Sequence, residues 1–99
     1  MSTPINKSAA KVLKVLKAMR GNSLQGITNQ KLCNHLNESP ASITRALQTL
    51  AEEGLVQQEE DGTYRLSAAM VQMAKSHLQE VERAKARISE FEQRTSVIN

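Results

Sequence analysis

The 99-residue sequence has few aromatic side chains, with one Tyr, one Phe and no Trp, so a core must come mainly from aliphatic residues and Met. It has a single cysteine, Cys33, which excludes an internal disulfide and fits a reducing compartment. No apolar run reaches membrane-spanning length, and the N-terminus has no signal-peptide pattern. We therefore expect one small, soluble, cytoplasmic protein. Its core is thin, and a chain of this size is often completed by a partner subunit.

Sequence signatures of catalysis and cofactor binding are also missing. The four glycines each fall at an expected helix end or turn, so none builds a phosphate-binding loop. Cys33, His35 and His77 lack the spacing of a zinc site, and Cys33 fits a small buried side chain better than a reactive thiol. No carboxylate pair or Ser–His–Asp arrangement stands out. We predict that the protein is not an enzyme and binds no metal or cofactor.

Positive charge is present but uneven. The formal net charge is +3 and the pI about 9.3. Residues 1–58 carry seven Lys/Arg and three acids, whereas residues 59–99 carry six basic and seven acidic residues. If the chain binds a polyanion, its first half is the part that does so.

One stretch, Ser39 to Gly54, predicts a short helix with both ends marked. Ser39 can cap its start, Pro40 suits the first helical position, and Gly54 suits the left-handed residue that ends a helix. Its apolar stripe must pack on a core, whereas the opposite face is small and polar. That face carries Ala41, Ser42, Arg45 and Gln48, with Thr44 and Thr49 at its edges.

Two further helices precede this stretch. Ser8 to Arg20 predicts the first, ending at Gly21, with Val12, Leu13, Leu16 and Met19 as its buried face. The lysines of this helix either form a solvated face or contact phosphates. Thr28 caps the second helix, Asn29 to about Leu36, and a three-residue connection then leads into the third. Two short helices joined so closely are typical of a helix-turn-helix.

A β-hairpin is predicted directly after Gly54. Leu55 to Glu59 and Thr63 to Leu66 have strand composition, and Asp61-Gly62 is a strong hairpin turn. Three helices followed by a hairpin is the winged-helix order. The predicted fold is therefore mainly α with a small β-hairpin, a winged helix-turn-helix followed by a long C-terminal helix.

The run Ile27 to Ser67 resembles the N-terminal DNA-binding domain of the IclR-type transcriptional regulators. The matching features are Ser42-Ile43-Thr44-Arg45-Ala46-Leu47, Leu50, Glu53-Gly54-Leu55-Val56, Asp61-Gly62 and Tyr64-Arg65-Leu66. The resemblance, with the first helix, covers residues 8–67. It implies that the helix matching Ser39–Glu53 enters the major groove of DNA and that the hairpin lies beside the backbone or minor groove.

The sequence departs from this family in three respects. The family's turn between its second and third helices usually contains Gly, whereas this chain has Asn37-Glu38, and Asn accepts left-handed backbone angles. The wing tip, Glu59-Glu60-Asp61, is acidic and repels phosphate. The remaining chain is too short for the family's effector-binding domain, so we expect a small stand-alone version.

Residues after Ser67 predict one long helix to about Arg94, with a frayed tail at Thr95–Asn99. Apolar residues recur there at alternating spacings of four and three, which is typical of a coiled-coil seam. We expect this seam to pair with a second copy rather than fold back on its own domain. His77 within it is either a tolerated polar residue or a pH sensor. The predicted interface is Met70, Ala74, His77, Val81, Ala84, Ile88 and Phe91.

The sequence thus predicts a homodimeric, sequence-specific regulator that binds double-stranded DNA, most simply a repressor. Residues 1–67 would form the winged helix-turn-helix domain, and residues 68–99 the dimerisation helix. Two alternatives are a protein-interaction module, which the acidic wing favours, and an architectural DNA binder without sequence preference. The predicted DNA contacts are Thr28, Gln30, Lys31, Ser39, Ser42, Thr44, Arg45, Gln48 and Arg65, the first four and Arg65 on the backbone and the rest on base edges.

Overall fold

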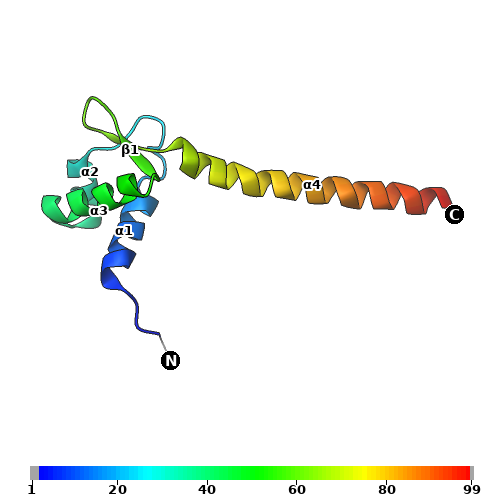
Figure 1. The fold of residues 1–99 in the computed structure, drawn as a ribbon, viewed down its shortest axis with the longest axis horizontal. Coiled ribbons are helices and arrows are strands. Elements are labelled where there is room, and N and C mark those ends of the chain that lie inside the picture. Colours follow the sequence, from blue (N-terminus) through cyan, green and yellow to red (C-terminus); the bar gives the residue numbers. More distant parts are fainter. Residues whose placement is uncertain (1–2, 99) are drawn as a thin grey trace.

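A computed structural model describes residues 3–98 of the chain. Three short helices and a two-stranded hairpin form a compact body, and a long helix extends away from it (Figure 1). The predicted fold class, a winged helix-turn-helix with a long C-terminal helix, is confirmed. The elements in order are α1 (Lys7–Ala18), α2 (Asn29–Leu36), α3 (Pro40–Glu52), β1 (Val56–Gln58), β2 (Tyr64–Leu66) and α4 (Ala68–Ile98).

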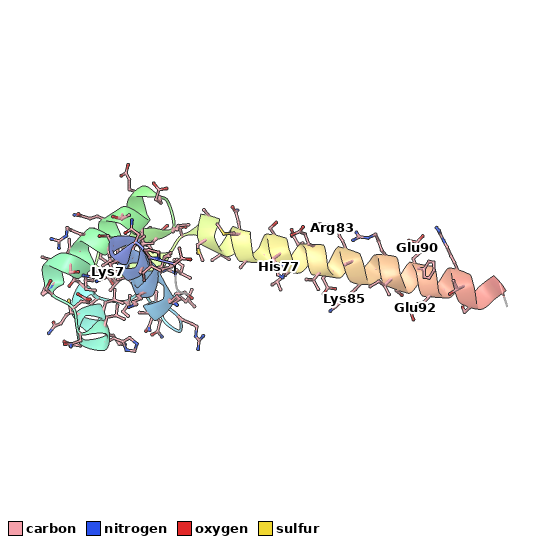
Figure 2. The ribbon with its side chains drawn as sticks, turned by 90° about the horizontal axis from the view of Figure 1, so that it is seen from below. Lys7, His77, Arg83, Lys85, Glu90 and Glu92 are labelled. Carbon is pink, nitrogen blue, oxygen red and sulfur yellow. The ribbon has the colours of Figure 1, made fainter. Side chains whose placement is uncertain are left out.

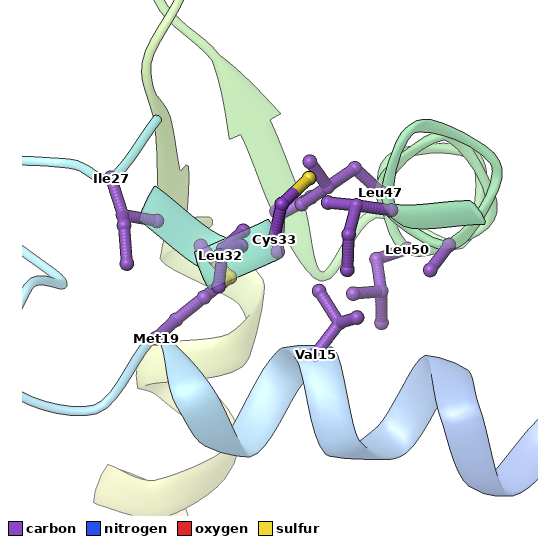
Figure 3. Close-up of a cluster of buried hydrophobic side chains, with 10 residues drawn as sticks. Val15, Met19, Ile27, Leu32, Cys33, Leu47 and Leu50 are labelled. Carbon is purple, nitrogen blue, oxygen red and sulfur yellow. The ribbon is translucent and has the colours of Figure 1, made fainter. Parts of the chain in front are cut away.

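The core lies where the three short helices meet the start of the hairpin (Figure 3). The helices contribute Val15 and Met19 from α1, Leu32 from α2, and the stripe Ile43, Leu47 and Leu50 from α3. Each of these side chains is almost completely removed from water, which stabilises the fold by about 1.5–3 kcal/mol per side chain.

The buried face of α1 differs from the prediction by one position. Val15 is fully buried, whereas Leu13 is 55% exposed. At 3.6 residues per turn, Val12, Val15, Leu16 and Met19 form one continuous stripe, and Leu13 lies about 100° from Val12. The helix begins earlier than predicted because Asn6 caps it by accepting a hydrogen bond from the backbone N–H of Ala9 at 3.0 Å. It also ends earlier than predicted, at Ala18.

The hairpin pairs Val56 with Leu66 and Gln58 with Tyr64 in antiparallel register. Ile27, which precedes α2, pairs with Tyr64: each backbone N–H donates to the other residue's carbonyl, at 2.9 and 2.8 Å. This pairing ties the segment before α2 to β2. Gly26 permits it, because its φ is +86° and a Cβ at this position would lie 2.7 Å from Thr63 Oγ1.

Helix α4 has 31 residues and begins at a fixed junction. The Ser67 backbone N–H donates to the carbonyl of Leu55 at 2.9 Å, and its hydroxyl accepts from the N–H of Met70 at 3.2 Å, as the side chain of a helix cap does. The predicted end at Arg94 is wrong, since the helix continues through Thr95 to Ile98; Asn99 lies outside the described residues.

The long helix makes the molecule elongated. Its radius of gyration is 19.9 Å, against about 13 Å for a compact chain of 100 residues. Across residues 3–98, no helix combines the length and the apolar character needed to cross a membrane.

Candidate nucleic-acid interface

Helices α2 and α3 form the helix-turn-helix, and each has the cap expected from the sequence. Thr28 Oγ1 accepts from the N–H of Lys31 at 3.1 Å, and Ser39 Oγ accepts from the N–H of Ser42 at 3.2 Å. Asn37 ends α2 with φ +55° and ψ +49°. The expectation that Asn supplies the left-handed turn is confirmed, and this turn sets the direction in which α3 leaves α2.

The exposed face of α3 carries Arg45 and Gln48, with Ala41 and Thr49 beside them. Among the described residues, the Arg45 guanidinium has no carboxylate within ion-pair distance. The Thr49 hydroxyl is not free in the same way, because it donates to the Arg45 carbonyl at 3.0 Å. Arg45 and Gln48 are therefore available to another molecule, and both can form bidentate hydrogen bonds to base edges. Exposed Glu52 follows one turn after Gln48 on the same face.

Two residues predicted to read base edges lie differently. Ser42 is only 7% exposed, because its position on α3 faces α1 beside the buried stripe, so its predicted place on the exposed face is wrong. Thr44 is half-buried, and its hydroxyl accepts from Asn29 Nδ2 at 2.8 Å. This hydroxyl serves the contact between α2 and α3.

Asn29 is the residue that the sequence reasoning missed. Besides Thr44, its amide nitrogen reaches the carbonyl of Pro40 at 3.4 Å, and its Oδ1 accepts from the thiol of Cys33 at 3.1 Å. The Asn29 side chain thus connects Cys33, one turn further along α2, to Pro40 and Thr44 in the first half of α3. A polar residue directly after a helix cap, opposite a Thr on the next helix, was the only sequence signal for it.

The residues predicted to contact the DNA backbone from α2 and its cap lie on the surface. Thr28, Gln30 and Lys31 are exposed at the start of α2, and Ser39 is exposed at the start of α3. The N-terminus of a helix favours bound anions, because its first backbone N–H groups are free and the positive end of the helix dipole lies there. Cys33, one turn further along α2, forms no disulfide and is buried, as expected.

A basic groove separates α1 from α3. It has a volume of about 370 Å³ and is lined by Lys7, Ser8, Lys11, Val12, Ser42, Arg45, Ala46 and Thr49. Lys7 stands at the N-terminal end of α1, on the compact body (Figure 2). Lys11 is also held at 3.4 Å from Glu38, a partly exposed ion pair that contributes little to stability. The groove extends the positive surface beside Arg45.

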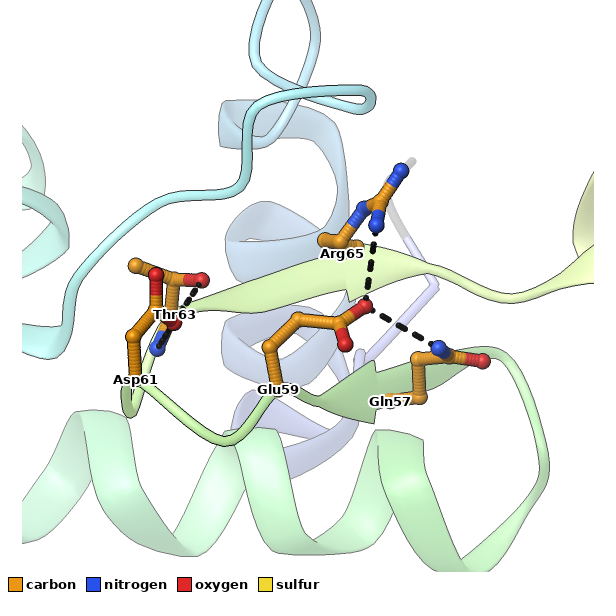
Figure 4. Close-up of polar contacts among 5 residues, drawn as sticks. All are labelled: Gln57, Glu59, Asp61, Thr63 and Arg65. Atoms are coloured by element: carbon orange, nitrogen blue, oxygen red, sulfur yellow. Dashed lines mark hydrogen bonds and ion pairs between the residues drawn. The ribbon is translucent and has the colours of Figure 1, made fainter.

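Three charged side chains of the wing, residues 56–66, make hydrogen bonds within it (Figure 4). The Glu59 carboxylate accepts from the Arg65 guanidinium at 3.2 Å and from the Gln57 amide at 3.0 Å. Asp61 Oδ1 accepts from the Thr63 hydroxyl at 2.7 Å and from its N–H at 3.0 Å. These hydrogen bonds from Thr63, and then the Arg65 charge, lower the pKa of Asp61 below its ordinary value of 3.8. The hairpin's cation is thus bound by the hairpin's own acid.

The predicted interface residues all belong to α4, which extends away from the body (Figure 1). Figure 2 labels one of them, His77, on the extending part of this helix. Val81, Ile88 and Phe91 are exposed, Phe91 by 67%, and Met70 and Ala84 are partly buried. Ala74 and His77 are exposed as well. Adjacent to this seam, Val71, Met73 and Leu78 widen the apolar surface near the body. Across the described residues, no group of three potential metal ligands occurs.

Known proteins match both the helix-turn-helix and the arrangement of the elements. The IclR helix-turn-helix domain family matches residues 8–60. An IclR family transcriptional regulator from Brucella abortus is similar in structure, with a TM-score of 0.66 and 18% identity over 80% of this chain and 31% of that chain. ZitR from Lactococcus lactis is similar with a TM-score of 0.49 and 26% identity, over 92% of this chain and 61% of that chain.

The chain spans less than two thirds of the length of either solved structure. A comparison with curated proteins found no match. The likeness to the Brucella abortus regulator supports the fold, and the family match covers more than half of the chain, from α1 into the wing. The chain belongs to the IclR helix-turn-helix domain family.

Proposed function

We propose that this protein is a site-specific regulator of transcription that binds double-stranded DNA as a homodimer. The observation that carries the proposal is the exposed face of α3, where Arg45 and Gln48 stand free on a helix that belongs to an IclR-type helix-turn-helix. Arg pairs in bidentate fashion with guanine and Gln with adenine in the major groove. The protein acts by binding, and no catalytic step is assigned to it.

The two kinds of DNA contact come from different elements. Arg45 and Gln48 read base edges, with Thr44 at the margin of the contact. Thr28, Gln30, Lys31 and Ser39 fix the helix on the backbone, since their positions at helix starts suit phosphate. Lys7 and Lys11 in the basic groove add positive charge on the other side of α3. Arg65 contributes only after release from Glu59.

The dimer is assigned to α4. We divide the chain into a DNA-binding domain, residues 1–67, and a dimerisation helix, residues 68–99; Met1, Ser2 and Asn99 lie outside the described residues. A two-fold dimer presents two copies of α3 and therefore selects a palindromic site. Occupancy of that site is the simplest mode of action, so we propose that the protein represses by blocking polymerase.

Selection of bound sequences from a random duplex pool, at low and at physiological salt, tests this function. The proposal expects an enriched palindrome that is retained at physiological salt, because base contacts add to the salt-sensitive phosphate term. A pool without enrichment, with binding that disappears as salt rises, would contradict site-specific regulation.

The acidic wing favours a second function, a docking platform for another protein. Glu60 and Asp61 are exposed at its tip, and Arg65 is already paired with Glu59. Such a surface repels DNA and suits a basic partner. Substitution of Glu60 by Gln together with Asp61 by Asn distinguishes the two proposed functions. This change leaves or raises DNA affinity if the protein is a regulator, and abolishes partner capture if it is a docking module.

A further inference from the structure

The apolar seam of α4 is flanked by charges in an order that distinguishes between the two ways of pairing helices. With Ala74, Val81 and Ile88 as the a positions of the heptads, His77, Ala84 and Phe91 are the d positions. The g positions are then Met73, Glu80 and Arg87, and the e positions are Leu78, Lys85 and Glu92. All of these flanking side chains, including the charged Glu80, Lys85, Arg87 and Glu92, are exposed to solvent in the single chain.

We propose that α4 binds α4 of a second copy in parallel and in register, so that both DNA-binding bodies lie at the same end of the coiled coil. This inference rests on the proposed function only for the identity of those bodies. In a parallel pair, each g residue faces the e residue of the next heptad on the other helix. Every such pair within residues 73–92 is then complementary: Met73 with Leu78, Glu80 with Lys85, and Arg87 with Glu92 of the partner subunit.

An antiparallel pair is poorly matched on the same residues. There e faces e and g faces g, and the register that overlaps the two seams best brings Ala74 opposite Phe91 of the partner subunit. Leu78 then faces Lys85, Val71 faces Glu92, and Met73 faces Arg94, so apolar side chains lie against charges. Only Glu80 with Arg87 is complementary. A shift by one heptad in either direction makes matters worse, because it sets Glu80 against Glu80 or Lys85 against Lys85.

The single chain does not fix these charges elsewhere. Lys85 lies 3.4 Å from Glu82 in the same helix, an exposed contact with side chains 69% and 72% accessible. Such contacts are weak and exchange readily. Glu80, Arg87 and Glu92 make no ion pair with any residue of the described chain. The charges of the flanks are therefore available to a second helix, and the exposed Ile88 and Phe91 supply an apolar surface for it to cover.

Site-directed disulfides test the direction of pairing. Facing core positions come within disulfide reach, so Ile88→Cys and His77→Cys chains should each crosslink to themselves in a mild redox buffer if the pair is parallel. If the pair is antiparallel, neither variant crosslinks alone, but an equal mixture of the two does. The wild-type chain is the control, because its one cysteine, Cys33, is buried in the body.

Charge reversal tests the pairing of the flanks. Glu80→Lys and Lys85→Glu should each weaken the dimer by about tenfold, since two attractions per dimer become repulsions. The double variant should restore wild-type affinity, because the reversed charges face each other again. Antiparallel helices would leave the double variant weak, with Lys at position 80 opposite Arg87 of the partner subunit.

Failures of the inference and of the proposed function give different results. A stable dimer with crosslinks only in the mixed sample overturns the parallel arrangement and leaves the homodimer intact. A wild-type chain that sediments as a monomer at tens of micromolar overturns the dimer itself. The random duplex pool distinguishes the two. Enrichment of any half-site sequence reports recognition by the face of α3 in every case, whereas the number and spacing of the half-sites report how the chains pair.

Discussion

Asn29 connects α2 to α3 through one side-chain amide, which contacts Thr44 Oγ1, the Pro40 carbonyl and the Cys33 thiol. The position of Arg45 therefore depends on a residue that need not touch DNA itself. Hydrogen bonds within a protein contribute about 0.5–1.5 kcal/mol each, and a partner left unpaired costs more.

Asn29→Ala should lower the free energy of unfolding by about 1–2 kcal/mol, because it removes these contacts and leaves the Thr44 hydroxyl without its donor. Chemical denaturation followed by circular dichroism measures this change. Asn34→Ala is the matched control, since Asn34 lies exposed on the same helix. Asn34→Ala reports the change in helix propensity, which favours Ala. Equal changes in both variants would show that the contacts of Asn29 add nothing beyond that propensity.

Asp61 makes the wing sensitive to acid. Hydrogen bonds from Thr63 lower the pKa of Asp61 in the folded protein. The ionised carboxylate therefore stabilises the turn fully when the pH is above 3.8, the ordinary pKa of this group. That contribution is lost as the pH falls through the lower folded value. The Thr63 amide resonance should therefore titrate with a midpoint below 3.8. In the Asp61→Asn variant this titration should be absent; a midpoint at or above the ordinary value would contradict the geometry of the turn.

At the scale of the elements, the sequence predicted α2 and α3 well because their ends depend on local chemistry. Thr and Ser are favoured caps when they directly precede a helix, as Thr28 and Ser39 do. Gly54 adopts φ +76°, as a residue that ends a helix commonly does. The start of α1 was harder to predict, since both Asn6 and Ser8 can cap a helix. In the structure Asn6 is the cap, because it accepts the hydrogen bond from the Ala9 N–H.

The pairing of Ile27 with Tyr64 could not be predicted by the same means. It joins residues far apart in the chain, and its sequence signal is no more than a β-branched residue after a glycine. The burial of Ser42 also depends on tertiary contact, because only the placement of α1 decides which small polar residue of α3 is covered. Local sequence patterns therefore predicted the elements but not every contact between them.

Gly26→Ala tests this packing of the loop against the wing. The substitution should destabilise the fold by about 2–4 kcal/mol, since a φ of +86° strains alanine and its Cβ would lie 2.7 Å from Thr63 Oγ1. Gly62→Ala is the control, with a similar φ of +89° but nothing within 4 Å of the added Cβ. Thermal unfolding of both variants separates backbone strain, common to the two, from the clash, which only Gly26→Ala introduces. Equal losses would contradict the close approach.

For the whole molecule, the elongated shape follows from one long helix with an exposed apolar seam. At 1.5 Å per residue, α4 is about 46 Å long, and most of that length extends away from the compact body (Figure 1). Association is the ordinary way to bury such a surface. The heptad spacing predicted this seam from sequence, whereas the direction of pairing depends on the flanking charges of two chains at once.

Val81→Glu should convert the proposed dimer to a monomer, because dimerisation would bury a carboxylate at the centre of the seam. Analytical ultracentrifugation detects the change. Gln79→Glu, on the opposite side of the same helix, adds the same charge and should leave the dimer unaffected. A Val81→Glu chain that still sediments as a dimer would place the subunit contact outside α4.

The proposed parallel pairing would also set the geometry of the DNA site. The junction at Ser67 holds α4 to the body, so two bodies at one end of the coiled coil lie side by side. Half-sites should then be centred about one helical turn apart, roughly 34–36 Å. Footprinting on the selected duplex measures this spacing. Half-sites separated by several turns would instead fit bodies held apart by the full length of antiparallel α4 helices.

Site-specific reading of DNA by α3 is tested most directly by the affinity for the selected duplex relative to a scrambled duplex of the same composition. The comparison is made at physiological salt with the wild type and with Arg45→Ala. We predict a wild-type preference of about a thousandfold or more. Arg45→Ala should weaken binding to the selected duplex alone, by about 1–3 kcal/mol. A wild-type ratio near one, or an equal loss on both duplexes, would contradict base recognition by α3.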